Sequence, residues 1–315
     1  MEKRPRRVDY IMSSTIKAFI SLFLVSVLWG LNYPISAYLL QDFSPVFLST
    51  VRICCTSLFL IIVALIHKGI KRPTISEWRF LVGVGIFGTL LNQTFYFTGL
   101  HHTTPANASL IISLAPIATI LLERIIFKVK FTVKKSAGAI ISLIGVFSII
   151  GVGKGGLGIS WGDFNILIAM LCLSISLLFI RGLAKTMNTF IITVYSTVLG
   201  SVLMIPAAGV ENLVSGSYIS HSLFMWILLA FAGIIAQGVA GFWWNKGVAK
   251  VGAGTSSMFM NIQPFVAILA SHFILGNHIL MNQILGGILV LLGVFIANMP
   301  SIKNAVSTGP NKVAM

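Results

Sequence analysis

A cluster of polar and aromatic residues interrupts the first long apolar segment of the chain. It consists of Trp29, Asn32 and Tyr33, which share one helical face at i, i+3 and i+4 spacing. An amide facing lipid loses its hydrogen bonds, so Asn32 faces either a neighbouring helix or a watery cavity, and we favour the cavity. Tyr33 suits a ligand site or an aromatic belt at the membrane boundary. Pro34 is expected to break the turn that follows.

Arg52 is the one charged residue well inside an apolar segment. It lies on the order of 10 Å from the outer end of that segment, at about 1.5 Å per helical residue. A charge at this depth is costly and is a candidate for function. Three roles remain open: it snorkels to the outer surface, it pairs with Asp42 or with free carbonyl groups, or it binds the carboxylate of a solute.

Two further segments carry stripes in which glycines alternate with polar and aromatic residues. The positions follow one another at i, i+4, i+8 and i+11, which keeps them on one helical face. Such a stripe either lines a solute site or packs helices through glycines and interhelical hydrogen bonds. The stripes are Gly88, Asn92, Tyr96 and Gly99, and Gly233, Gln237, Gly241 and Trp244.

Two other segments place a polar residue three positions before a proline near mid-segment. These pairs are Ser113 with Pro116 and Asn261 with Pro264. A proline inside a helix leaves the carbonyl four residues earlier without its partner and kinks the helix. Near the membrane midplane such a carbonyl must meet protein, water or solute. We therefore predict that both segments line the solute site, with a hinge or packing kink as the alternative.

Two titratable residues are candidates for proton coupling, Glu123 and His272. Each has a plainer interpretation. Glu123 can pair with Arg124 or with lysines of the inner loops, and a histidine near a segment end is commonly interfacial.

The sequence shows no paired acids, metal-ligand cluster or nucleophile with a base at mid-depth, so we expect no enzyme, no catalytic residue, no metal and no cofactor. The predicted solute-binding residues are Trp29, Asn32, Tyr33, Arg52, Asn92, Tyr96, Ser113, Gln237, Trp244 and Asn261.

Composition identifies the elements that carry these residues. Of the 315 residues, 57% are hydrophobic and only 9% are charged. The apolar blocks are roughly 18–24 residues long, about the length that spans a bilayer as a helix. We predict an all-α, polytopic membrane protein with ten transmembrane helices, at 16–36, 45–66, 78–99, 106–127, 136–152, 162–181, 190–209, 222–243, 255–275 and 279–299.

The distribution of basic residues gives the orientation. Of the 22 Lys and Arg residues, all but Lys154 and Arg52 fall in the N-terminal segment, the C-terminal tail or alternate loops. The positive-inside rule then places both termini in the cytoplasm of a cell-membrane protein, with tails at 1–15 and 300–315. The net charge of +15 is thus topological and does not indicate nucleic-acid binding. We expect membrane lipids as surroundings and a monomer or weak homo-oligomer.

An internal repeat divides the chain. A shift of 148 positions superposes Pro116 on Pro264, Gly138 on Gly286, and Gly145-Val-Phe on Gly293-Val-Phe. Five spans per repeat is an odd number, so the halves at 16–152 and 162–299, joined by an external linker at 153–161, are predicted to cross the membrane in opposite directions. Inverted repeats recur in secondary carriers. The shift also pairs Tyr96 with Trp244, and we expect these rings to face each other.

These motifs resemble a known family. The stretch Trp-Gly-x-Asn-aromatic at 29–33, Arg52, and the SLxP and NIxP segments with their trailing Gly-x6-Gly-Val are similar to the EamA-type branch of the drug/metabolite transporter superfamily, over residues 16–299. Such repeats commonly carry a glutamate about thirteen residues after the proline. Val129 and Asn277 stand at those places here, so no role of that glutamate can be transferred.

The resemblance implies transport of a small metabolite. Amino acids and hydrophobic drug-like compounds are the leading classes, and export is the usual direction. Sparse charge at depth favours a neutral, zwitterionic or weakly anionic solute. The chain carries no ATP-binding motif, so we predict a secondary carrier that works by alternating access. The alternatives are a hydrophobic drug efflux carrier and a non-transporting membrane sensor or scaffold.

Overall fold

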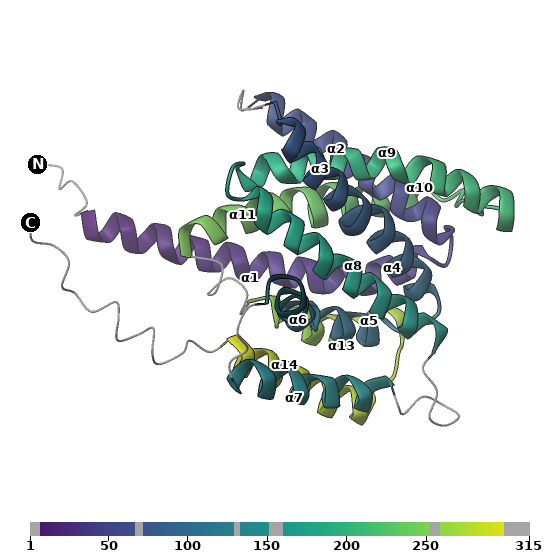
Figure 1. Cartoon of the computed structure of the whole chain (residues 1–315). Helices are drawn as coiled ribbons and strands as arrows, with labels where there is room; N and C mark the ends of the chain where they lie inside the picture. Colours follow the sequence, from purple (N-terminus) through teal and green to yellow (C-terminus); the bar gives the residue numbers. More distant parts are fainter. Residues whose placement is uncertain (1–6, 67–71, 129–132, 151–159, 252–258, 299–315) are drawn as a thin grey trace, which may run out of the picture.

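The computed structural model describes residues 7–66, 72–128, 133–150, 160–251 and 259–298, and within these ranges all regular structure is helical (Figure 1). The first half contains α1 (Arg7–Leu39), α2 (Pro45–Ile66), α3 (Ile75–Gly83), the π-helix η1 (Val84–Leu91), α4 (Asn92–His101), α5 (Pro105–Ile112), α6 (Ala115–Phe127) and α7 (Val133–Ile150). The second half contains α8 (Trp161–Leu183), α9 (Thr189–Ser215), α10 (Leu223–Gly233), the π-helix η2 (Ile234–Val239), α11 (Ala240–Val251), α13 (Gln263–Leu275) and α14 (Met281–Asn298).

Seven helical segments of the described chain are long and apolar enough to cross a membrane. Three shorter apolar helices accompany them, at Ser136–Gly145, Gln263–Leu275 and Met281–Ile296. The seven segments are Ile16–Leu39, Pro45–Ile66, Ile75–His101, Pro105–Ile126, Trp161–Leu183, Thr189–Ser215 and Leu223–Trp244. Several predicted segments lie outside the described residues: positions 153–159 of the linker predicted at 153–161, residues 252–258, and both predicted tails apart from the start of α1.

Polar caps fix several helix ends. Thr74 and Glu77 form a reciprocal capping box at the start of α3, and the side chains of Thr104, Ser160 and Asn188 accept hydrogen bonds from the first turns of α5, α8 and α9. Each cap satisfies backbone N–H groups that a helix start otherwise leaves without partners. These caps lie at the ends of apolar segments, so they help to set where each segment begins.

The prolines act differently from one another. The prediction that Pro34 breaks the following turn is wrong, because α1 continues through Pro34 to Leu39. A proline removes its own N–H donor, and a helix packed against neighbours tolerates that loss. Elsewhere α5 ends at Ile112 and α6 begins at Ala115 with Pro116 in its first turn. In the same way, a turn at 261–262 precedes α13, which carries Pro264 in its first turn.

Helices α7 and α14 pack side by side and lie together at one edge of the molecule (Figure 1). Glycines bring their backbones close: a Cβ at Gly145 would lie 2.6 Å from the carbonyl oxygen of Gly286, and one at Gly293 would lie 2.4 Å from that of Gly138. The contact of Gly145 with Gly286 therefore recurs between their counterparts under the shift of 148 positions, Gly293 and Gly138. Ser142 donates to the carbonyl of its own counterpart, Val290, at 3.1 Å.

A second pair of crossings follows the same rule. α2 packs on η2 and α9 packs on η1, and the two π-helices occupy corresponding places in the two halves. A Cβ at Gly233 would lie 2.7 Å from the carbonyl oxygen of Arg52, and one at Gly85 would lie 3.6 Å from the backbone nitrogen of Gly200. Gly85 is the counterpart of Gly233, and Gly200 is the counterpart of Arg52, so like positions meet in both halves.

We expect Gly293→Ala to destabilise the protein. The new methyl group would meet the Gly138 carbonyl and the Ser142 side chain, which forces α7 and α14 apart. Overpacking of this kind costs about 1–3 kcal/mol. Thermal unfolding in detergent checks it. The matched control is Gly209→Ala in α9, where a Cβ meets nothing within 4 Å and the helix propensity improves. Equal midpoints for the two variants would contradict the close crossing.

Candidate functional site

Arg52 lies at the centre of the candidate site. It is on α2 and only 4% exposed. Its Nη1 donates to Ser36 Oγ on α1 at 2.9 Å, and its Nη2 donates to Gln237 Oε1 on η2 at 2.9 Å. The guanidinium carbon also lies 5.4 Å from the centre of the Phe97 ring, within range of a cation–π contact. Helices of both halves thus converge on one cation.

The charge of Arg52 has no carboxylate beside it within the described chain. Both of its hydrogen-bond partners are neutral, and its Nε is buried without an acceptor. The predicted alternatives of snorkelling and of pairing with Asp42 are wrong, because Arg52 is buried and Asp42 accepts instead from Ser220 at 3.0 Å. A buried cation without an anion beside it is unfavourable, and the N–H group at Nε of Arg52 can donate to an anion that binds there.

Aromatic rings line the surroundings of Arg52. Tyr33 and Tyr96 meet edge to face with ring centres 6.0 Å apart, and Tyr96 also packs against Phe97 at 5.1 Å. The expectation that Tyr96 and Trp244 face each other is wrong: Trp244 packs on Trp29 at 5.0 Å. Each ring meets an aromatic residue of α1, so α1 forms a shared wall of the site.

Four further buried polar atoms lack hydrogen-bond partners in the described chain. They are the side-chain oxygens of Asn32 and Ser26 on α1, Nε2 of Gln263 on α13, and Oγ of Ser217 in the loop after α9. Buried polar groups are ordinarily satisfied, so each such atom is a candidate contact for water or solute. Asn32 was predicted from the sequence, whereas Ser26 and Gln263 were not.

Other predicted residues take part in helix contacts. Asn92 donates to the carbonyl of Ala169 on α8 at 2.8 Å and accepts from Gln93 at 3.0 Å. Ser113 donates to the carbonyl of Leu110 where α5 ends, and Asn261 lies in the turn before α13. For Asn92 the structure shows a hydrogen bond between two helices, which was one of the two roles that the sequence left open for this stripe.

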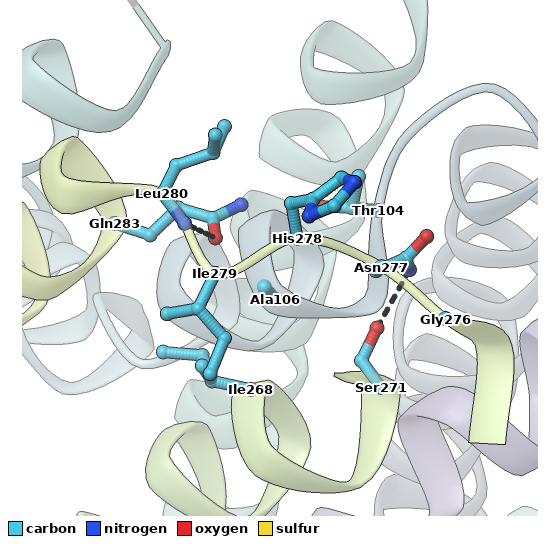
Figure 2. A pocket seen from close by; sticks show the side chains of 10 residues that line it. All are labelled: Thr104, Ala106, Ile268, Ser271, Gly276, Asn277, His278, Ile279, Leu280 and Gln283. Atoms are coloured by element: carbon cyan, nitrogen blue, oxygen red, sulfur yellow. Dashed lines mark hydrogen bonds between the residues drawn. The ribbon is translucent and has the colours of Figure 1, made fainter. Parts of the chain in front are cut away.

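Two cavities lie among helix ends and the turns that join them. One, of about 360 Å³, is lined by residues of α1, α4 and the 216–222 loop, among them Leu40, Leu100 and Tyr218. The other, of about 250 Å³, lies beside α13 and the turn before α14 (Figure 2). Thr104 and Asn277 line both cavities, and neither cavity includes a predicted solute-binding residue. They therefore lie outside the arginine-centred site.

Asn277 stands where the family commonly has a glutamate. Its side chain donates to Ser271 Oγ at 2.7 Å (Figure 2), and its carbonyl lies 2.9 Å from Nδ1 of the exposed His272. A neutral amide therefore closes the turn between α13 and α14. The other such position, Val129, lies outside the described residues.

Glu123 pairs with a residue that the sequence did not suggest. Its carboxylate forms an ion pair with Arg181 of α8. The contact joins α6 to α8 near the ends of both helices. Arg181 is 58 positions away in the chain, so only the packing of the two helices brings it near.

Several functional contacts have little or no signal in the sequence. Ser36 follows Asn32 by one helical turn and was detectable on that face, but nothing marks Phe97.

The carboxylate of Glu211 on α9 accepts from the backbone N–H groups of Val46 and Phe47 at 2.9 and 2.8 Å, which caps α2. Nearby, Tyr218 lies in the loop after α9, where burial and, to a lesser extent, Glu211 raise the pKa of its phenol.

The comparisons with known proteins agree with this architecture. A transporter of Bacillus subtilis (strain 168), described as the uncharacterized transporter YyaM, is 29% identical over 291 residues, covering 90% of this chain and 94% of its own. An uncharacterized transporter of Archaeoglobus fulgidus is 26% identical over 284 residues, covering 89% and 98%. One solved crystal structure has the same fold, with a TM-score of 0.62 and 18% identity over 88% of this chain and 94% of that chain.

The model of the EamA-like transporter family matches residues 16–151 and 160–299. These ranges include all the elements of the candidate site. The protein is accordingly a non-enzymatic, multi-pass membrane transporter, and it belongs to the EamA-like transporter family of the drug/metabolite transporter superfamily.

Proposed function

We propose that the protein is a secondary carrier for a small solute with a carboxylate group, and that amino acids are its main class of substrate. The observation that carries this proposal is Arg52, a buried cation whose hydrogen-bond partners are neutral and whose Nε has no acceptor in the part of the chain that the structure describes. A carboxylate suits the planar donor edge of an arginine and would neutralise the charge. A single deep cation also suits a zwitterionic or weakly anionic solute better than a polyanion.

The aromatic pairs supply the rest of the proposed site. The apolar body of the solute packs against the Trp29 and Trp244 rings or against the Tyr33 and Tyr96 rings. The oxygen of Asn32 has no partner and accepts a hydrogen bond from a solute N–H group. Carboxylate, N–H group and apolar side chain together describe an amino acid with a large side chain.

Alternating access between two inverted halves is the proposed mechanism. Its support is that contacts recur under the shift of 148 positions: Gly145 packs on Gly286, their counterparts Gly293 and Gly138 pack on each other, and Ser142 donates to its own counterpart Val290. An inverted repeat places corresponding helices in opposite directions, so an exchange of conformations between the halves turns an inward opening into an outward one. We assign ten spans in a 5+5 arrangement on this basis.

The remaining features of the proposal follow from charge and family. The basic loops favour a cell-membrane protein with both termini in the cytoplasm, acting as an exporter. Glu123 and His272 are the proposed groups for proton coupling, and release of Glu123 from Arg181 would accompany its protonation. The two halves complete one site within one chain, which suits a monomer or a weak homo-oligomer.

Counterflow in proteoliposomes tests the carrier. With unlabelled amino acids inside, we expect saturable uptake of labelled phenylalanine, stimulated several-fold over empty liposomes because a carrier exchanges solute faster than it returns empty. A pH gradient added to the same assay tests proton coupling. Empty liposomes and an internal sugar are the controls. A flat result with correctly inserted protein would exclude amino acids, and efflux of apolar dyes would then favour the drug carrier.

We expect Arg52→Lys to raise the KM for phenylalanine. Lysine keeps the charge but loses the two-donor edge, and a hydrogen bond to a charged group is worth about 1.5–3 kcal/mol, or roughly 10–150-fold. Initial rates of counterflow give the KM. The control is Arg181→Lys, at the ion pair with Glu123, where the side chain is 61% exposed and the change is expected to be small. An unchanged KM in a well-folded Arg52→Lys protein would remove Arg52 from the solute site.

A further inference from the structure

Gln237 occupies part of the edge of Arg52 on which a carboxylate would bind. In a guanidinium group, Nε and Nη2 point their N–H bonds in parallel, and a carboxylate accepts from both at once. Here Gln237 Oε1 accepts from Nη2 at 2.9 Å, while Nε next to it has no acceptor among the described residues. The amide oxygen thus bonds to one of the two nitrogens of this donor edge.

The bond between Arg52 and Gln237 is not required for these helices to pack. Thr56 on α2 already donates to the carbonyl of Gly233 on α10 at 2.8 Å, next to the close approach of Gly233 to Arg52. In the other half, the counterparts of Arg52 and Gln237 are Gly200 and Thr89. There a Cβ at Gly200 would lie 2.3 Å from Cβ of Thr89, so the matching crossing is close without any cation or amide.

Gln237 also lies on an element suited to small displacements. It is in the π-helix η2, between α10 and α11. A π-helical turn holds an extra residue in a wider ring, and such turns are rare and frequently mark functional sites. A shift within this turn would move the amide off Arg52 while the Thr56 and Gly233 contact holds the crossing in place.

We propose that Gln237 is a stand-in ligand for Arg52, which holds Nη2 while the carrier is empty and yields to the carboxylate of the arriving solute. This inference rests on the proposed function. A carboxylate forms the stronger, charge-assisted bond and fills Nε as well, so it displaces the amide. After the solute leaves, the amide returns and limits the number of bare donors on a buried cation. Gln237 is thus a positioning residue for the empty carrier.

The test separates two transport modes with labelled phenylalanine in proteoliposomes. Exchange against external unlabelled phenylalanine never requires the empty carrier to reorient, whereas net efflux into phenylalanine-free buffer does. In Gln237→Ala the empty carrier keeps two bare donors on Arg52, so we expect net efflux to fall about tenfold further than exchange, together with a lower KM in exchange.

Two further variants keep the inference falsifiable. Gln237→Glu is nearly the same size and places a permanent carboxylate beside Arg52, so we expect a KM in exchange at least about tenfold higher and a ratio of net efflux to exchange near that of wild type. Thr89→Ala changes the corresponding position of the other half, where the counterpart of Arg52 is a glycine, and should leave the ratio and the KM near wild type.

The outcomes distinguish the inference from the proposal beneath it. Wild-type protein that neither exchanges nor releases phenylalanine would overturn the proposed function and this inference with it. Wild-type exchange combined with equal loss of both modes in Gln237→Ala, or with a lower KM in Gln237→Glu, would overturn the stand-in role alone. A purely structural role for Gln237 predicts equal loss of both modes.

Discussion

The rest of this structure depends on a buried positive charge, the guanidinium group of Arg52. Arg52 is buried between α1, α2, α4 and η2, and its neighbours in the described chain supply hydroxyl, amide and aromatic contacts in place of a carboxylate. A central arginine costs roughly 2.5–3.5 kcal/mol on membrane-insertion scales. The surrounding helices must therefore hold this residue firmly, and the carboxylate of the proposed solute would neutralise its charge.

The firm packing comes from small residues. At the crossings of α7 with α14 and of α2 with α10, glycines let one backbone approach the carbonyl groups of the next. Lipid gives apolar side chains little reason to prefer protein, so close backbone contact and hydrogen bonds carry more of the association in a membrane. The same positions recur in both halves, which means that the two halves use one packing solution twice. The exception is the Arg52 and Gln237 pair, whose counterparts are Gly200 and Thr89.

The sequence predicted the helical class, most segment positions and the family because these follow from hydropathy, charge and short motifs. Helical spacing also placed Trp29 and Tyr33 on one face of α1, where each packs on an aromatic ring of another helix. The errors concern how helices lie against one another. Tyr96 and Trp244 each pack on α1, Glu123 pairs with Arg181, and α1 passes through Pro34. Spacing fixes the direction of a side chain about its own helix axis, but it does not fix how one helix is rotated or shifted against the next. The contact of Phe97 with Arg52 depends on that rotation and shift, so the sequence could not predict it.

The Glu211 carboxylate has a mechanical consequence. Its two oxygens accept hydrogen bonds from two backbone N–H groups at the start of α2, which is the positive end of the helix dipole. The residue itself belongs to α9, in the other half of the chain. Sliding of α2 along its axis would break both bonds and leave the partly buried carboxylate without these partners. Rotation about that end would keep them. Glu211 therefore fixes the start of α2 to α9, and Arg52 lies less than two helical turns from this fixed end.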